Sequence, residues 1–267
     1  MTALVQARTP DAVAAVRLRS GLSYWTSGYR TMLRWHLVGL RMWLSLLVVI
    51  QVLAGVGFVL GMSLFVHPIP PIVALFVSTG VPVVNLLMVG LFLGPQLVAD
   101  QKIQQSFDFI QALPIPRTAS AAAWYTVTLV AGIPAVVVSL LVAVARYHLA
   151  LSISVAVVPA VLLTCFAGTM LGYALAYAIP NPMTTRLITQ LLVFSVFGFT
   201  PILFRVSQMP HWLGVVNWWL PFRHMAQIVR ASLTDGLVSG VTTSYVIVTA
   251  WAIVCAVLSA RALGRRP

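Results

Sequence analysis

Long stretches without any charged residue constrain this chain more than any other feature. Residues 42–99 contain no Asp, Glu, Lys or Arg, and the same is true of 118–145, 147–185, 187–204 and 236–260. Each stretch can hold the roughly 17–25 apolar residues that a helix needs to cross a bilayer. Only 7% of the 267 residues are charged, against about a quarter in soluble domains. We therefore expect an all-α membrane protein with several spans.

Six transmembrane helices fit the apolar runs, within a transmembrane domain covering 42–267 that follows a cytosolic tail at 1–21. The segment 206–240 is too polar to cross the membrane and too apolar to lie free in water. Pro221 and the pair Trp218-Trp219 predict two short interfacial or re-entrant outer helices there, because Trp favours the membrane–water boundary. The six spans are expected at 43–65, 72–98, 119–145, 153–179, 185–204 and 241–261.

Residues 22–41 have the pattern of an amphipathic helix. Arg30 and Arg34 fall on one helical stripe, and Trp25 lies on another face. Such a basic, aromatic-rich helix suits the membrane surface, where arginines meet anionic lipid. We expect an interfacial helix, the alternative being that 22–41 is the polar start of the first span.

The basic residues lie unequally on the two sides of a six-span arrangement. Twelve of the sixteen Lys and Arg residues fall on the side of the two termini, and four fall on the other. Because cytoplasmic loops are enriched in Lys and Arg, both termini are expected in the cytoplasm. The membrane is expected to be the inner (cytoplasmic) membrane of the cell. The basic residues punctuate spans and form no basic face, so we expect no nucleic-acid partner.

Groups that perform chemistry are scarce in this sequence. The chain has no Glu, and none of its four Asp residues lies near the centre of a span, where coupled transporters usually keep an ionisable group. No phosphate-binding G-x-x-x-x-G-K-[ST] motif and no metal-ligand spacing occurs. Cys165 and Cys255 lie in apolar runs, as small hydrophobic residues do. We expect no catalytic residues, no metal site and no cofactor on this chain.

A transporter without its own energy-coupling groups must take energy from a partner, and the polar segment 99–118 is the best place for that partner to bind. Residues 103–110 can form a helix with Ile103, Phe107 and Ile110 on one face, ended by Pro114. The alternative is a solvated loop whose apolar side rests on the bilayer.

The outer segment adds two patterns. Met209-Pro210-x-Trp212 follows the fifth span, and Pro221 is followed nine residues later by Arg230. In order and spacing, the interfacial helix, the six spans, the 99–118 segment and these outer patterns resemble the membrane subunit of ABC exporters of the type-2 permease class.

The coupling segment carries part of this resemblance. Ser106-Phe107-Asp108 stands where the family has Thr-Leu-Glu, and Pro114-Ile115-Pro116-Arg117 stands at the Pro-containing end. Gln105 replaces the usual Gly before the triplet, and Leu220 replaces an Asn often found before the outer Pro.

The resemblance implies a permease subunit paired with a second permease, identical or different, and with two copies of an ABC ATPase subunit that binds ATP and Mg. Phe107, Phe109 and Ile110 would fill a groove on the ATPase, while Asp108 and Arg117 would make charged contacts. Arg30 and Arg34 would hold the interfacial helix near lipid headgroups. The residues expected to couple to the ATPase are Asp100, Lys102, Phe107, Asp108, Phe109, Ile110, Pro114 and Arg117.

Polar amides within the spans are the candidates for the translocation path. Gln51, Asn85 and Gln190 stand out, because an amide in hydrocarbon is costly without a partner. The implied substrate is a hydrophobic or amphipathic compound, drug-like or lipid-like, moved out of the cytoplasm or the inner leaflet. The alternatives are a lipid-linked polysaccharide exporter permease, or a membrane scaffold or channel without an ATPase.

Overall fold

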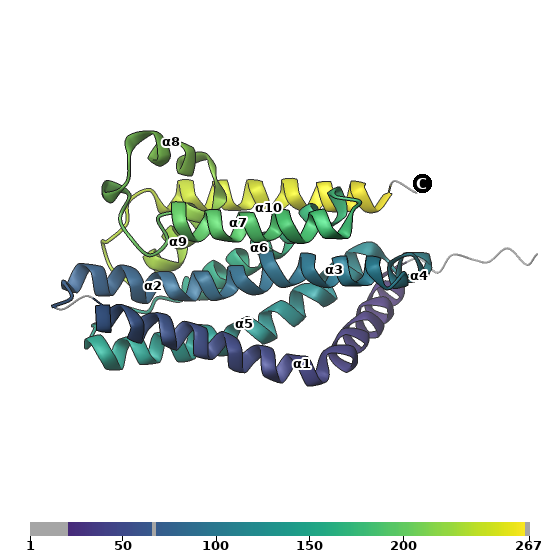
Figure 1. The fold of residues 1–267 in the computed structure, drawn as a ribbon, viewed down its shortest axis with the longest axis horizontal. Helices are drawn as coiled ribbons and strands as arrows, with labels where there is room; N and C mark the ends of the chain where they lie inside the picture. Colours follow the sequence, from purple (N-terminus) through teal and green to yellow (C-terminus); the bar gives the residue numbers. More distant parts are fainter. Residues whose placement is uncertain (1–20, 66–67, 265–267) are drawn as a thin grey trace, which may run out of the picture.

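The computed structural model describes residues 21–65 and 68–264, and every regular element in this part of the chain is a helix (Figure 1). Six helical segments are long and apolar enough to cross a membrane. The predicted all-α, six-span fold is confirmed, and the predicted tail lies outside the described residues except for Gly21. The spans are α1 (Leu22–Phe65), the run α2, η2 and α3 (Pro71–Leu87, Met88–Leu93 and Gly94–Ile103), α5 (Arg117–Tyr147), α6 (Val157–Ala178), α7 (Pro182–Phe199) and α10 (Val241–Gly264).

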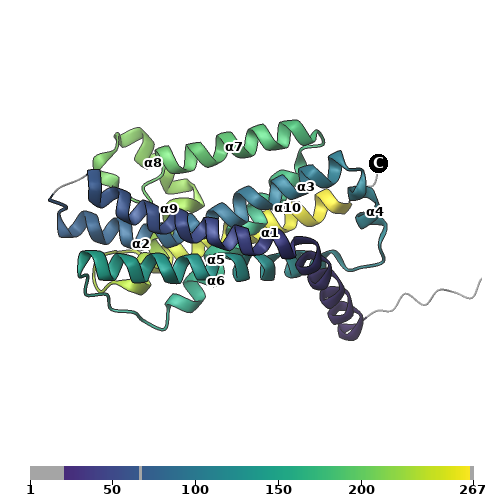
Figure 2. The same ribbon diagram turned by 60° about the horizontal axis from the view of Figure 1, so that its bottom comes forward.

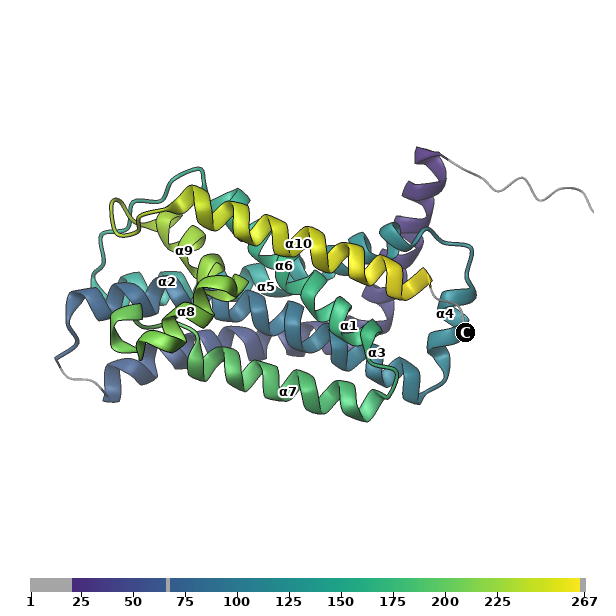
Figure 3. The ribbon, with the colours of Figure 1, turned by 90° about the horizontal axis from the view of Figure 1, so that it is seen from above.

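The spans lie side by side around the second one, which runs from α2 to α3. Helices α1 and α5 pack together on one side of it, α6 and α10 pair on another, and α7 packs against α3 (Figures 1 and 2). Seen from above, the short helix α4 (Ser106–Ala112) lies at one end of the bundle, together with the end of α10 (Figure 3). Helices α8 (His211–Trp219) and α9 (Pro221–Leu233) lie toward the other end. The two regions with predicted functions are therefore at opposite ends.

The second span is the central helix of the bundle, and 72% of its most apolar 18-residue stretch is buried inside the protein. Pro82 does not interrupt it, because α2 continues through that residue. The helix widens instead to π geometry over Met88–Leu93. Pro95 follows this turn, has no N–H to bond the carbonyl four residues earlier, and would clash with it in a regular α-helix. The wider turn accommodates Pro95 without breaking the span.

Helix α1 is continuous from Leu22 to Phe65, so the expected interfacial helix and the first span form one element. Its first part nevertheless turns away from the bundle axis, as the purple segment in Figures 1 and 2 shows. Arg30 and Arg34 are exposed on this first part, and Trp25 is half-buried. The bent, continuous helix combines features of both interpretations that the sequence allowed.

Helix α6 crosses the second span at close range, because glycines meet where the two backbones approach. A Cβ atom on Gly172 would collide with the carbonyl oxygen of Gly90. A Cβ atom on Gly90 would in turn lie 2.8 Å from the backbone nitrogen of Thr169. Small residues at helix crossings allow backbones in a membrane to pack this closely.

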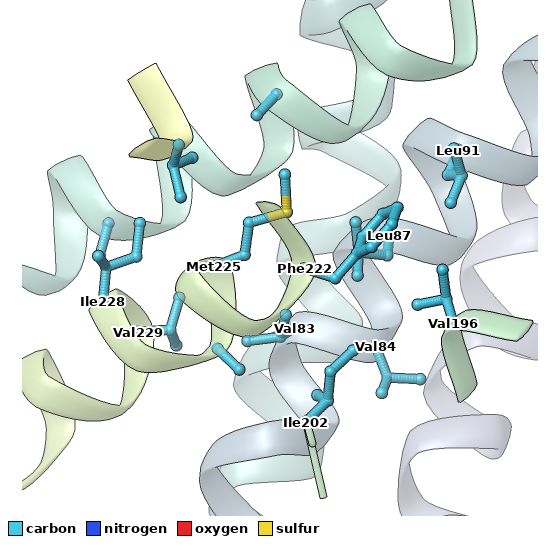
Figure 4. Packing of buried hydrophobic residues seen from close by; sticks show 14 of the residues in the cluster. Val83, Val84, Leu87, Leu91, Val196, Ile202, Phe222, Met225, Ile228 and Val229 are labelled. Carbon is cyan, nitrogen blue, oxygen red and sulfur yellow. The ribbon is translucent and has the colours of Figure 1, made fainter. Parts of the chain in front are cut away.

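The two outer helices expected around Pro221 are present, but they differ in burial. Helix α8 is mostly exposed, and Trp212 on it is 65% exposed. Helix α9 begins at Pro221, a favoured first helical residue because its missing N–H would have no partner there. Its apolar face, including Phe222 and Met225, packs on the second span and on Ile202 (Figure 4). Helix α9 is thus part of the core rather than a surface helix.

The glycine crossing generates a testable prediction. Gly172→Ala should destabilise the purified protein by about 1–3 kcal/mol, since the added methyl group forces the backbones of α6 and the second span apart. The midpoint of thermal unfolding in detergent should fall. Gly198→Ala in α7 is the matched control, because nothing lies within 4 Å of that position. Equal melting of the two variants would contradict the close crossing.

Candidate functional site

The predicted coupling segment folds as two helices joined by a tight turn. The second span ends at Ile103, and α4 follows at Ser106–Ala112. Ile103 therefore lies on a different helix from Phe107 and Ile110, which corrects the single helix expected over 103–110. Gln105 adopts a left-handed conformation with φ of 57°, where Gly has no steric cost. Gln105 is also the position at which the type-2 permease pattern has Gly.

Proline ends the segment as expected. Leu113, before Pro114, is extended with ψ of 138°, as the residue before a proline generally is. Pro116 caps the start of α5, and Arg117 is the first residue of that helix and is exposed. Helix α4 is therefore held between the two spans that flank it.

Lys102 joins three helices at this end of the bundle. Its Nζ donates hydrogen bonds of 2.7 Å to the carbonyl oxygens of Ala176 and Ile179, at the end of α6. A cation at a helix C-terminus is favourable, because the last carbonyls have no partners within the helix. The same ammonium group lies 5.2 Å from the centre of the Phe107 ring on α4. Lys102 thus ties α3, α4 and α6 together.

A chain of aromatic contacts leads from α4 into the bundle. The Phe107 ring lies 5.9 Å from that of Tyr177, which lies 5.3 Å from that of Tyr173, both on α6. Tyr173 stacks on Trp124 of α5, and Trp124 contacts His36 of α1 at 5.2 Å. Such rings pack with specific geometry, and their contacts link α4 in turn to α6, α5 and α1. Sequence analysis missed these partners, although Tyr173 and Tyr177 share one face of α6.

Three aromatic residues fasten the first part of α1 to the same end. Trp25 Nε1 donates to Thr118 Oγ1 at 3.0 Å. The hydroxyl of Tyr29 bonds to that of Thr126 at 2.9 Å, and the Tyr24 hydroxyl donates to the Pro114 carbonyl. Trp25 therefore contacts the start of α5 in addition to any role at a membrane surface.

Asp100 and Arg186 form an ion pair that joins α3 to α7, the only one among the residues that the structure describes. Their side chains are 42% and 36% exposed, respectively. A pair this exposed contributes about 0–1 kcal/mol. The pair therefore adds little to the stability of the contact between α3 and α7.

The surface of α4 offers one aromatic residue to a partner. Phe109 is 62% exposed and Ile103, in the preceding helix, is 51% exposed. Phe107 and Ile110 are half-buried against this chain. Asp108 lies on α4, but its side chain is outside the described part of the structure. Of the three apolar residues expected to fill a groove on an ATPase, Phe109 has the exposed position.

An apolar groove of about 620 Å³ lies between α1, the second span and α5. Trp43, Leu47 and Leu93 are among its apolar lining residues, and Asp100, Gln101 and Gln104 are among its polar ones. A neighbouring pocket of about 260 Å³ shares the two glutamines and Trp124 with it.

Two buried nitrogens beside the smaller pocket have no hydrogen-bond partner within the described residues: Trp124 Nε1 and His36 Nε2. Trp124 is only 4% exposed. A buried donor without a partner is costly, so an oxygen-bearing ligand in the pocket would gain a hydrogen bond from the indole.

The three amides expected on a translocation path do not gather at one place. Asn85 is buried and donates to the Ala135 carbonyl at 3.3 Å and to Ser139 Oγ at 3.4 Å. Gln51 is 8% exposed, and its Oε1 has no partner in the described part of the chain. Gln190 is exposed on α7. Asn85 therefore joins two helices of this chain, whereas Gln190 faces outward.

At the end of the bundle opposite α4, Pro210 immediately precedes α8 and Arg230 is 98% buried on α9. Arg230 donates to Thr79 Oγ1 at 3.0 Å and to the Ile202 carbonyl at 2.6 Å. Burial lowers the pKa of Arg230 to about 10, which leaves the guanidinium protonated at neutral pH. Within the described residues, no group of three or more His, Cys, Asp or Glu side chains is placed to hold a metal ion.

The turn at Gln105 gives a second prediction. Gln105→Gly should stabilise the turn, because a non-glycine residue in the left-handed region costs about 1–2 kcal/mol, and Gln105→Val should destabilise it. Hydrogen exchange of the α4 amides should slow in the first variant and quicken in the second. Gln104→Gly is the control, since Gln104 has φ of −80°. A slowing of exchange by Gln104→Gly equal to that by Gln105→Gly would refute the conformational explanation.

Comparison with known proteins identifies the family. The family model described as ABC-2 family transporter protein matches residues 76–261. The match includes most of the second span, the four spans that follow, and helices α4, α8 and α9. No curated protein matches the chain. Proteins of this family are transport permeases without catalytic activity of their own, and they generally pair with ABC ATPase subunits. The chain belongs to the ABC-2 family of transporter proteins and is a multi-pass membrane component of such a transporter.

Proposed function

We propose that this chain is the permease subunit of an ATP-driven exporter that moves a hydrophobic or amphipathic compound, drug-like or lipid-like, across the membrane. The observation that carries the proposal is that α4 is exposed on one side and packed against the spans on the other. It presents Phe109 to a partner and is joined through Phe107 and Lys102 to α6. A helix exposed on one side and packed on the spans on the other can transmit force between them.

In this proposal ATP and Mg bind to two copies of a separate ATPase subunit. Phe109 enters a groove on that subunit, and Asp108 and Arg117 make charged contacts beside it. Phe107 does not contact the ATPase but transmits the movement of α4 to α6, because its ring packs on that of Tyr177. ATP binding then biases the bundle between two arrangements, and the exposed Asp100–Arg186 pair opens as α7 shifts.

The groove beside α1 supports the substrate class. Its volume of about 620 Å³ lies within the range of about 300–1,000 Å³ typical of small-molecule sites. It is apolar along the spans and polar at the end near α4, where Gln101 and Gln104 lie. An amphiphile would place its apolar body along Trp43 and Leu47 and its oxygen atoms near the glutamines and the Trp124 indole.

A second permease subunit is part of the proposal, and Gln190 supports it. This amide is exposed on α7, among the exposed apolar side chains of Leu187, Leu191 and Phe194. An amide facing hydrocarbon lacks hydrogen-bond partners. A second copy of this chain, or a related permease, packed against α7 would supply them.

Photo-crosslinking tests the coupling role of α4. A photoreactive phenylalanine analogue at Phe109, in cells that express the chain, should form an adduct with an ABC ATPase subunit, identified by mass spectrometry. The same analogue at Phe107 is the matched control and should react within the chain, because that side chain packs on Tyr177. Adducts of position 109 with lipid alone would overturn the proposal and favour a scaffold or channel without an ATPase.

We propose that α4 lies on the cytoplasmic side of the inner membrane and α8 on the opposite side. Cysteine labelling tests this orientation. Ser207→Cys should react with a membrane-impermeant maleimide in intact cells, and Gln104→Cys should react only after permeabilisation. Both positions are exposed, and the two native cysteines are buried. The opposite labelling pattern would reverse the orientation.

A further inference from the structure

Three arginines line one pocket of about 390 Å³ at the end of the bundle opposite α4. Arg205 precedes α8, and Arg223 and Arg230 lie on α9. The Phe76 ring on α2 lies beneath two of them, 4.0 Å from the Arg230 guanidinium and 5.5 Å from that of Arg205. Three like charges that line one pocket repel one another unless something compensates them.

The hydrogen bonds of these arginines leave their charge uncompensated. Arg230 bonds only to neutral oxygens of Thr79, Ile202 and Phe76. Nε of Arg223 is buried and has no hydrogen-bond partner among the described residues. A buried donor on a charged group is costly when it is left unpaired.

The chain supplies little negative charge to this end. It contains four Asp and no Glu. Asp235 lies two residues before Leu237, which lines the pocket; it is exposed, and the described part of the chain gives it no ion pair. No described carboxylate forms an ion pair with these arginines, so a bound anion would supply the balancing charge.

An apolar trough of about 530 Å³ adjoins the arginine pocket. The two share Val206, Ser207 and Arg223. Trp218 and Trp219 line the trough and are 44% and 68% exposed. Exposed Trp side chains are typical of the membrane–water interface, and basic pockets between transmembrane helices are suited to lipid headgroups.

We propose that the arginine pocket binds an anionic phosphate group, that of a phospholipid headgroup, and that the lipid's acyl chains occupy the trough beside it. The guanidinium groups of Arg205 and Arg223 bind the phosphate oxygens, since guanidinium matches phosphate in charge and geometry. Arg230 contributes charge while it holds α9 to α2. This site goes beyond the proposed export function and does not depend on it.

Native mass spectrometry of the full chain in detergent tests the site, with titrated phosphatidylglycerol and phosphatidylcholine as probes. The wild-type protein should bind phosphatidylglycerol at least tenfold more tightly than phosphatidylcholine, because the choline cation of the latter is repelled by the arginines. Arg223→Gln and Arg205→Gln should each weaken phosphatidylglycerol binding about tenfold, equivalent to about 1.4 kcal/mol. Arg146→Gln is the matched control, since Arg146 is exposed at the same end and does not line the pocket.

A parallel arm with inorganic phosphate separates the two sources of the ligand. Phosphatidylglycerol should raise the thermal unfolding midpoint at micromolar concentrations, and phosphate should not. If phosphate alone stabilises the protein as strongly and this effect is lost in Arg223→Gln, the ligand is a soluble anion and the lipid assignment is wrong. Equal lipid binding by Arg223→Gln, Arg205→Gln and Arg146→Gln would refute the anion site itself.

Discussion

The requirement that backbone and polar groups be satisfied away from water governs this structure, and the buried second span shows how it is met. Hydrocarbon offers no hydrogen bonds, so the span must stay helical through Pro82 and Pro95. It does so by widening to π geometry over Met88–Leu93 and by bonding Asn85 to α5. The same span packs against α6 at the Gly90–Gly172 crossing, and its last turn carries Asp100 and Lys102. The two polar contacts that tie α3 to α6 and α7 therefore depend on its position.

The strength of the contacts around α4 suggests where the molecule can move. Lys102 makes two short hydrogen bonds to the end of α6 and lies over Phe107, so α3, α4 and α6 form one packed unit. The Asp100–Arg186 pair is exposed and weak by comparison. A push on α4 would accordingly move α6 with it and change the position of α7 at low cost. An arrangement of strong contacts on one side and weak contacts on the other is what a two-state transporter needs.

Several features could be predicted from the sequence because they depend on local chemistry. The long uncharged runs predicted the positions of the spans, and Pro221 predicted the boundary between α8 and α9. The polar segment 99–118 was expected to contain a short helix ended by proline, and it does. The start of that helix was predicted too early, because the left-handed turn at Gln105 follows from how α3 meets α4 and leaves no periodic signal. The inward position of Phe107 depends on Tyr177, which lies 70 residues further along the chain.

The sequence by itself determined the environment of this protein, since a chain with 7% charged residues and five long uncharged runs can only fold in a membrane. It also determined the helix boundaries at Pro114 and Pro221, because proline restricts its own neighbours, whereas Pro82 and Pro134 lie inside continuous helices. Only the tertiary structure decided which polar residues are partners. Arg230 was expected on an outer helix, but its burial against Thr79 and Ile202 arises because α9 packs into the core. The gathering of three arginines at one pocket likewise required α9 and the segment before α8 to fold over α2, a long-range arrangement that no local pattern encodes.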